Sequence, residues 1–244
     1  MTLLLLAGTG EARRIADALG RGPVPVLASL AGATRDPERL AVRTLIGGFG
    51  GEDGFRLALR DCGITAVLDA THPFAHRISA RTARVCGDLG LPYAQLLRPE
   101  WEPGPSDDWV MLDTEDQAAA HIAPGATVFL ATGRQTLDRF ANLEGRRVIC
   151  RQIDPPDGPF PFPGGEFLVG RPPFSVADEI RLFQDLGVDW LVVKNAGGAA
   201  SRTKLDAARE LGVKVAMIAR PPQPEETKLE TVEDALAWVE GLPW

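Results

Sequence analysis

The chain has 244 residues, of which 45% are hydrophobic and 24% are charged, and its formal net charge is −7. These values are typical of a folded protein with a substantial core, and they argue against disorder. The acidic balance argues against a general affinity for nucleic acid or anionic membranes, although it is compatible with a local basic pocket for an acidic small molecule. Apolar runs stay well short of the about 18 residues of a membrane span, and the N-terminus lacks the pattern of a signal peptide. We therefore expect a cytoplasmic protein.

The cysteines Cys62, Cys86 and Cys150 are odd in number and widely spaced. Their spacing gives no Cys-x-x-Cys pair, and the chain shows no other cluster of metal-ligand spacing. We therefore expect three reduced structural thiols and no metal site.

Apolar runs alternate with helical patterns along the whole chain, as is typical of parallel sheets flanked by helices. Continuous hydrophobicity predicts buried strands in the first half, at residues 3–7, 24–29, 42–46, 66–69 and 93–97. Apolar residues at helical spacing predict helices around residues 12–19 and 78–89.

Residues 98–108 interrupt this alternation with three prolines, a glycine and several charges, which predicts a crossing between two domains. Strands are then predicted at residues 127–131, 147–150, 190–194 and 214–218. Helices are predicted at residues 115–121, 135–142, 176–186, 203–211 and 232–241. The proline-rich segment 154–165 predicts a loop at the surface or at the edge of a cleft. The fold class expected is α/β, with two Rossmann-like parallel-sheet domains (residues 1–100 and 101–244) and a ligand cleft between them.

The first predicted strand runs directly into Gly8-Thr9-Gly10-Glu11-Ala12-Arg13. Glycines there let a pyrophosphate approach the backbone, and the helix that follows offers N–H groups and a partial positive charge. The usual dinucleotide fingerprint has a third glycine where Arg13 stands, so a purely structural turn is the alternative. Thr9 is expected to add a hydroxyl to a phosphate, whereas Glu11 either contributes to the loop or caps the helix start.

The end of the second predicted strand points to the type of cofactor. NAD-binding folds place an acidic residue there for the ribose hydroxyls, whereas residues 29–35 contain no carboxylate. Ser29, Thr34 and Arg35 can instead hold a 2′-phosphate, which favours NADPH over NADH. The alternative for Arg35 is a loop arginine in solvent.

A histidine follows the fourth predicted strand, in Asp69-Ala70-Thr71-His72-Pro73-Phe74-Ala75. Because it precedes a proline, His72 is pushed toward an extended backbone. We expect His72 to position a nicotinamide ring or to supply a proton, and the alternative is a loop histidine that bonds the backbone. Asp69 is expected to hydrogen-bond the turn.

Two predicted strands of the second half end in similar loops. Thr132-Gly133-Arg134 opens one helix, and the loop 194–198 precedes another that carries Lys204 in its first turn. Backbone N–H groups and cations at the carboxyl ends of strands suit anions, and Arg220 follows the last of these strands. This convergence in an acidic protein predicts a polyanionic ligand.

In this order the motifs resemble the precorrin-6A reductase family of cobalamin biosynthesis. The similarity covers nearly the whole chain through residues 8–13, 29–32, 69–75, 132–134, 194–198 and 203–208. Ala196 stands where we expect a serine to be commoner in relatives, and the loss of that hydroxyl matters little in a backbone-driven loop. The resemblance implies that hydride from NADPH reduces a ring double bond of precorrin-6A, without a metal, and gives the dihydro product precorrin-6B.

The site residues follow from the motifs and this resemblance. The catalytic residues expected are His72, Lys194 and Arg134. The cofactor-binding residues expected are Gly8, Thr9, Gly10, Glu11, Ala12, Ser29, Gly32, Thr34, Arg35, Thr71, His72 and Pro73. The substrate-binding residues expected are Arg134, Lys194, Asn195, Gly197, Gly198, Lys204 and Arg220.

The expected partner is a small-molecule polycarboxylate tetrapyrrole, and hand-over between neighbouring enzymes of the pathway is a further expectation. Nucleic acid and membranes are not expected as partners. Two alternatives remain open: an NADPH reductase of another polycarboxylate metabolite, and a non-catalytic nucleotide-sensing module. The motifs do not separate a metal-free substrate from a cobalt-containing one.

Overall fold

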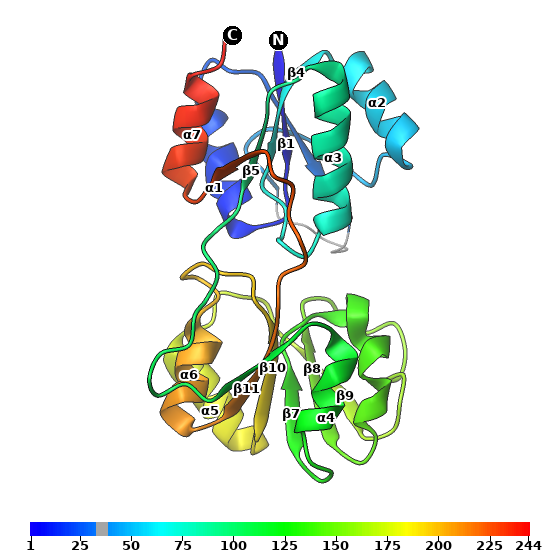
Figure 1. Cartoon of the computed structure of the whole chain (residues 1–244), viewed down its shortest axis with the longest axis vertical. Helices are drawn as coiled ribbons and strands as arrows, with labels where there is room; N and C mark the ends of the chain where they lie inside the picture. The colour runs from blue at the N-terminus through cyan, green and yellow to red at the C-terminus, as the bar shows by residue number, and fades with distance from the viewer. Residues whose placement is uncertain (33–38) are drawn as a thin grey trace. The chain divides into compact units, whose positions relative to one another are not determined.

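The computed structural model describes residues 1–32 and 39–244. The chain divides into two compact units: unit 1 comprises residues 1–99 and 221–244, and unit 2 comprises residues 100–220. Each unit is built around its own parallel sheet (Figure 1). Among the described residues, the helices are all too short or too polar to cross a membrane.

The sheet of unit 1 has the strand order β12-β5-β4-β1-β2-β3, and its pairs are parallel. The strands are β1 (Thr2–Leu6), β2 (Val26–Leu30), β3 (Arg43–Ile46), β4 (Ile64–Asp69), β5 (Tyr93–Leu96) and β12 (Thr227–Leu229). The helices are α1 (Gly10–Leu19), α2 (Glu52–Asp61), α3 (His76–Leu89) and α7 (Val232–Glu240).

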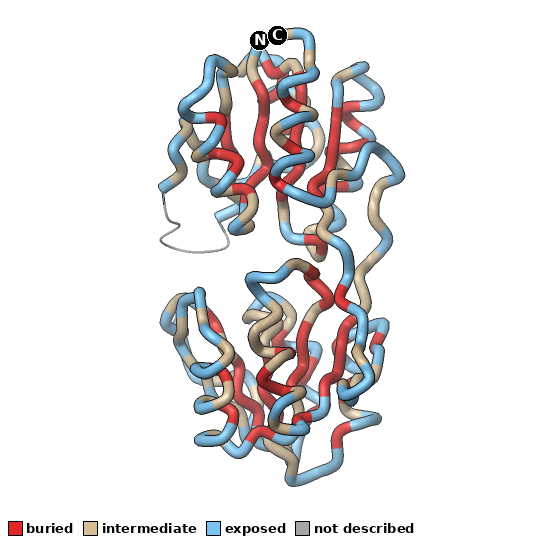
Figure 2. The backbone as a smooth tube through the Cα atoms, turned by 90° about the vertical axis from the view of Figure 1, so that its left-hand side faces the viewer, coloured by how far each residue is buried: buried red, intermediate tan, exposed pale blue. Residues whose placement is uncertain are grey.

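Alternating leucines of β1 build a core on each face of this sheet. Leu3 and Leu5 pack in one cluster with α1 and α7, and Leu4 and Leu6 pack in another with α2 and α3 (Figure 1). All four leucines are almost fully buried, as expected for a strand that is covered on both faces. Figure 2 shows these central strands as the buried part of the unit.

Unit 2 has the strand order β6-β11-β10-β7-β8-β9, again with parallel pairs. The strands are β6 (Trp109–Leu112), β7 (Thr127–Leu130), β8 (Arg147–Gln152), β9 (Gly165–Val169), β10 (Trp190–Lys194) and β11 (Lys214–Ile218). The helical segments are η1 (Glu115–Gln117), α4 (Ala118–His121), η2 (Arg134–Leu143), α5 (Val176–Leu186) and α6 (Thr203–Leu211). The segments α5 and α6 pack on one face of the sheet, with Phe183 and Leu205 in its core cluster, and α4 lies on the other face (Figure 1).

The strand orders create one topological switch point in each sheet. In unit 1 the chain proceeds outward from β1 through β2 to β3, and then from β4 to β5 on the other side. In unit 2 it proceeds from β7 through β8 to β9, and then from β10 to β11 on the other side. Ligands of open parallel sheets bind at such points, beyond the carboxyl ends of the strands. The candidate ligand-binding regions are therefore the loops after β1 and β4 in unit 1 and those after β7 and β10 in unit 2.

The predicted fold class of two parallel-sheet α/β domains is confirmed, with some differences in detail. The sequence did not predict α2, β6, β9 or β12. The expected second domain ran to residue 244, whereas residues 221–244 belong to unit 1. The reason is that β12 pairs with β5 and that Val232, Ala235 and Val239 of α7 join the core around α1. The cleft expected between the domains stays a prediction.

Two local features also differ from the expected pattern. The helix predicted at residues 135–142 is 3-10 helical, with a kink at Thr136 (φ −117°, ψ 18°). The helix predicted at residues 115–121 begins as the 3-10 turn η1 before α4.

The three cysteines are free. Burial raises the pKa of Cys86 to about 12 and that of Cys150 to about 11, so neither is a reactive thiolate at neutral pH.

Candidate active site

The glycine loop after β1 leaves room for a ligand against its backbone. Gly8 has a φ of 145°, which disfavours any side chain. A Cβ atom built at Gly8 or Gly10 would meet nothing within 4 Å. The first amides of a helix have no acceptor within the helix, and α1 begins at Gly10. The loop therefore combines open space with N–H groups suited to a phosphate.

Thr9 joins this loop to the end of β4. Its Oγ1 accepts a hydrogen bond from Ala12 N at 3.2 Å, which makes it the N-cap of α1, and donates to Ala70 O at 2.9 Å. The hydroxyl expected to contact a phosphate thus already holds the two sides of the switch point together. Glu11, which was expected in the loop or as a cap, forms an ion pair of 2.5 Å with Arg98.

Asp69 is the anchor of the loop after β4. Its carboxylate is fully buried. Oδ1 accepts from Thr71 N at 3.0 Å and from Thr71 Oγ1 at 2.7 Å, while Oδ2 accepts from the Tyr93 hydroxyl at 3.1 Å. Burial raises the pKa of Tyr93, and the neighbouring Asp69 carboxylate raises it further, so this hydroxyl stays a donor. The prediction that Asp69 hydrogen-bonds the turn is confirmed.

His72 lies exposed at the tip of this loop. Its Nδ1 accepts from Phe74 N at 3.2 Å, so the neutral ring carries its proton on Nε2. Pro73 is buried, and its carbonyl accepts from Gln223 Nε2 at 2.9 Å. The same Gln223 accepts from Gln95 Nε2 at 2.9 Å. The C-terminal segment of the chain thus supports the histidine loop, a feature that the sequence did not reveal.

The residues predicted to bind the 2′-phosphate are described only in part. Ser29 is buried at the end of β2. Gly32 has a φ of 76°, and a Cβ atom there would lie 3.9 Å from the Cα of Gly47. Thr34 and Arg35 lie outside the described residues.

In unit 2, Lys194 stands at the end of β10 within a polar cluster. Its Nζ donates to Thr136 Oγ1 at 3.1 Å and lies 3.7 Å from Glu115 Oε1. Burial lowers the pKa of Lys194, and Glu115 opposes that effect. Arg139 donates to the other oxygen of Glu115 at 3.0 Å. Burial tends to raise the pKa of Glu115, but its own backbone N–H, Arg139 and Lys194 together hold it below the ordinary value.

Asn195 and the glycines after it form a braced loop. Asn195 is 1% exposed. Its Oδ1 accepts from Trp101 N at 2.9 Å, and its Nδ2 donates to Trp101 O at 3.1 Å. The indole of Trp101 donates to Gly198 O at 2.8 Å, and Arg220 Nε donates to Asn195 O at 2.8 Å. The side chain of Asn195, predicted to bind substrate, is therefore used to hold the segment at Trp101. Gly197 and Gly198 have φ values of 68° and 84°.

The other predicted cations differ in their surroundings. Arg134 is exposed and lies 3.3 Å from Asp157. Lys204 is half-buried, with Nζ 5.7 Å from the centre of the Trp101 ring. Burial, helped by the nearby Arg151, lowers the pKa of Lys204 to about 8. The structure thus brings the predicted cations to one sheet edge but gives each a different environment.

Known proteins resemble this chain over nearly its whole length. The family described as "Precorrin-6x reductase CbiJ/CobK" matches residues 2–240. The chain belongs to this family. It is 46% identical to "Precorrin-6A reductase" of Rhodococcus erythropolis, over 98% of each chain. It is 42% identical to "Precorrin-6A reductase" of Mycobacterium tuberculosis (strain CDC 1551 / Oshkosh), over 99% of this chain and 98% of the relative.

A more distant relative and a solved structure agree with this assignment. "Cobalt-precorrin-6A reductase" of Priestia megaterium is 28% identical over 96% of each chain. A structure of "CobK precorrin-6A reductase" superposes with a TM-score of 0.94 at 36% identity, over 98% of this chain and 96% of that one. The resemblance predicted from the motifs is confirmed, and with it the assignment to a family of oxidoreductases that reduce a double bond of the corrin ring.

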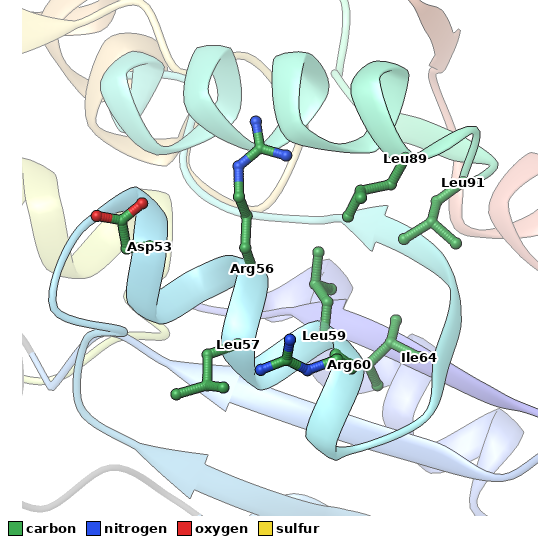
Figure 3. Close-up of a pocket in the computed structure, with 8 residues that line it drawn as sticks. All are labelled: Asp53, Arg56, Leu57, Leu59, Arg60, Ile64, Leu89 and Leu91. Carbon is green, nitrogen blue, oxygen red and sulfur yellow. The ribbon is translucent and has the colours of Figure 1, made fainter.

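Unit 1 also has a pocket lined by residues of α2, the start of β4 and the end of α3 (Figure 3). Its volume is about 640 Å³, and it is lined by Asp53, Arg56, Leu57, Leu59, Arg60, Ile64, Leu89 and Leu91. It lies at the amino end of β4, whereas the loops after β1 and β4 lie at the carboxyl ends of their strands. Arg56, one of its two arginines, is tied to Glu52 and Asp88. We therefore place no part of the reductase site there.

Proposed function

We propose that this chain reduces one ring double bond of metal-free precorrin-6A with NADPH and gives precorrin-6B. The names of its relatives support precorrin-6A as the substrate. The relatives at 46% and 42% identity are named for precorrin-6A, and the cobalt substrate appears in the name of the relative at 28%. This difference favours the metal-free substrate.

The observation that carries the proposal is that the motif loops gather at the two switch points. In unit 1 the open backbone at Gly8 and Gly10 and the start of α1 suit a pyrophosphate. The absence of a carboxylate among residues 29–35 suits a 2′-phosphate. The residues present thus fit NADPH, which supplies the hydride when bound. Thr9 and Glu11 contribute by fixing the loop through Ala70 and Arg98.

In unit 2 the carboxyl edge of the sheet suits a polycarboxylate. Four cations supply positive charge there, at the start of η2, the end of β10, the first turn of α6 and after β11: Arg134, Lys194, Lys204 and Arg220. Asn195 contributes by bracing its loop against Trp101. Cations held in this way position an acidic substrate and stabilise charge that develops in the transition state.

Reduction of a carbon–carbon double bond adds one hydride and one proton. In this proposal His72 positions the nicotinamide ring or delivers the proton. Delivery would come from Nε2, because acceptance at Nδ1 leaves the ring proton there. Lys194 and Arg134 act as electrostatic partners. The buried bonds of Asp69 to Thr71 keep the histidine loop in place.

The test is an anaerobic assay of NADPH oxidation with purified precorrin-6A, with cobalt-precorrin-6A and NADH run in parallel. We expect oxidation to be fastest with NADPH and the metal-free substrate. Absence of cofactor oxidation with either corrin precursor would remove the reductase proposal and favour another substrate or a nucleotide sensor. Replacing both Ser29 and Arg35 with alanine is expected to reduce the ratio of the rate with NADPH to the rate with NADH. An unchanged ratio would remove the assignment of these residues to the 2′-phosphate.

A pair of glycine variants tests the cofactor loop without disturbing the fold. A Cβ atom at either Gly10 or Gly87 meets nothing within 4 Å, and neither residue has a positive φ. Gly10→Ala and Gly87→Ala should therefore both leave the free protein as stable as before or slightly more stable. We expect only Gly10→Ala to weaken NADPH binding, because its methyl group enters the space assigned to the pyrophosphate. Equal NADPH affinity in the two variants would contradict that assignment.

A further inference from the structure

Gln152, the last residue of β8, is a buried side chain with unused hydrogen-bonding groups. It is 6% exposed. Neither its Nε2 nor its Oε1 has a hydrogen-bond partner among the residues that the structure describes. Buried amide groups are almost always paired, because leaving one unpaired costs free energy. Such a group at the carboxyl edge of a parallel sheet indicates a partner that binds there.

The strand register places Gln152 level with Lys194. Cys150 pairs with Leu130 on β7, and Leu130 pairs with Val192 on β10. Two residues further along, Gln152 and Lys194 still belong to β8 and β10 and stand level with each other, and Thr132 follows the end of β7 between them. We call these three residues the polar row. Adjacent strands lie about 4.8 Å apart, so the ends of the row are about 10 Å apart.

The side chains of Gln152 and Lys194 share one face of the sheet. Level residues of neighbouring strands point to the same side, and successive residues of one strand alternate. Lys194 contacts Thr136 of η2, which identifies the face. Arg151 points to the opposite face, where it forms a two-fold ion pair with Glu179 of α5 at 2.7 and 2.8 Å. Gln152 accordingly shares the η2 face with Lys194, beside the switch point between β7 and β10.

The chemistry of the polar row suits a carboxylate. Lys194 brings a positive charge, and Gln152 brings an N–H₂ group that is already removed from water. The hydroxyl of Thr132, which follows the strand between them, lies 3.5 Å from Gly133 O, the outer limit of a hydrogen bond. A Cβ atom at Gly133 would meet nothing within 4 Å, so there is open space beside the row.

We propose that Gln152 is a specificity-determining residue of the substrate side. Its N–H₂ group donates to one oxygen of an acidic side chain of the tetrapyrrole, and the other oxygen of that carboxylate faces Lys194. The inference deepens the proposed function and rests on it. It implies that Gln152 reduces the stability of the free protein and increases its affinity for the substrate.

The experiment compares Gln152→Leu and Gln152→Glu with Gln184→Leu. Gln184 is exposed on α5, on the opposite face of the sheet, and serves as the matched control. Three quantities are measured for each variant: the melting temperature, the KM and kcat with precorrin-6A, and the Kd for uroporphyrin, an octacarboxylate porphyrin, without NADPH. The Kd for NADPH is measured separately.

We expect Gln152→Leu to melt at the same or a higher temperature, because it removes an unpaired buried amide. Its KM and its Kd for uroporphyrin should rise about 10- to 100-fold, the effect of losing a hydrogen bond to a charged group. Gln152→Glu should bind more weakly still, because it places a carboxylate against a carboxylate. The Kd for NADPH and the properties of Gln184→Leu should match the wild type.

A change in the Kd of Gln152→Leu for uroporphyrin of less than about threefold would overturn the inference, and would mean that the amide holds only a structural water. If Gln152→Leu fails to fold, Gln152→Met replaces it with the same expectations. A wild-type chain that binds uroporphyrin through Gln152 but oxidises no NADPH with precorrin-6A would refute the proposed function alone. Failure of the two proposals is thus distinguishable.

Discussion

Replacing Asp69 with alanine tests how the histidine loop is held. The fully buried carboxylate accepts hydrogen bonds at 3.0 and 2.7 Å from Thr71 and at 3.1 Å from Tyr93. A hydrogen bond to a charged group contributes about 1.5–3 kcal/mol, and part of the sum is offset by the several kcal/mol that it costs to bury a carboxylate. We expect Asp69→Ala to lower the free energy of unfolding by about 3 kcal/mol, a large share of the roughly 5–15 kcal/mol of an ordinary protein.

Asp69→Asn and Tyr93→Phe serve as graded controls. The asparagine keeps Oδ1 for Thr71 and turns an N–H₂ group toward the Tyr93 oxygen, so a loss of only about 1 kcal/mol is expected. Tyr93→Phe removes one of the bonds and should cost about 1–2 kcal/mol. Unfolding in urea, followed by circular dichroism, gives the free energies, and NADPH titration shows whether the loop supports the cofactor. The reasoning would be refuted if Asp69→Ala were as stable as Asp69→Asn, or bound NADPH as tightly as the wild type.

Further substitutions address the other anchors. The pKa of Lys204 falls from 10.5 to about 8 on folding. Its charge therefore lowers the free energy of unfolding by the full amount below pH 8, and this loss disappears as the pH rises to 10.5. Lys204→Met should therefore raise the free energy of unfolding by on the order of 2 kcal/mol at pH 7 and leave it unchanged near pH 11; a difference independent of pH would contradict this. Thr9→Val should cost about 1–2 kcal/mol in urea unfolding by removing the N-cap of α1, whereas Thr9→Ser should keep most of it. Asn195→Ala should cost about 2–4 kcal/mol, because it leaves the backbone of Trp101 unpaired, without changing the Kd for NADPH; a weaker cofactor affinity would assign Asn195 a different role.

The parts of the fold that depend on local sequence were predictable. The run Leu3–Ala7 followed by Gly8 and Gly10 predicted a strand, a tight turn and a helix, and the structure has β1 and α1 there. Short or exposed strands carry too weak a signal: β12 has three residues, and two of them are exposed. It forms because β5 offers an edge, which is a tertiary effect. For the same reason the sequence could not show that residues 221–244 return to unit 1.

The site residues show a similar division. The positions of Thr132, Lys194 and His72 at the ends of strands were predicted from the apolar runs before them. The hydrogen-bond partners of the residues beside them were not predicted, because those partners are distant in sequence. Asn195 was expected to bind substrate, but its amide is used by Trp101 in the crossing segment. Gln152 gave no signal at all, since its significance depends on which residues stand level with it on β7 and β10.

The return of residues 221–244 to unit 1 affects the order in which the molecule can form during synthesis. Unit 2 is continuous in sequence and can fold as soon as its last strand has left the ribosome. Unit 1, although it contains the N-terminus, must wait with the outer edge of β5 unpaired until β12 emerges. Gln223, which bonds the loop of His72 through Pro73, arrives in the same late segment. A ribosome-bound chain that ends before residue 221 would therefore carry a finished unit 2 and an unfinished unit 1.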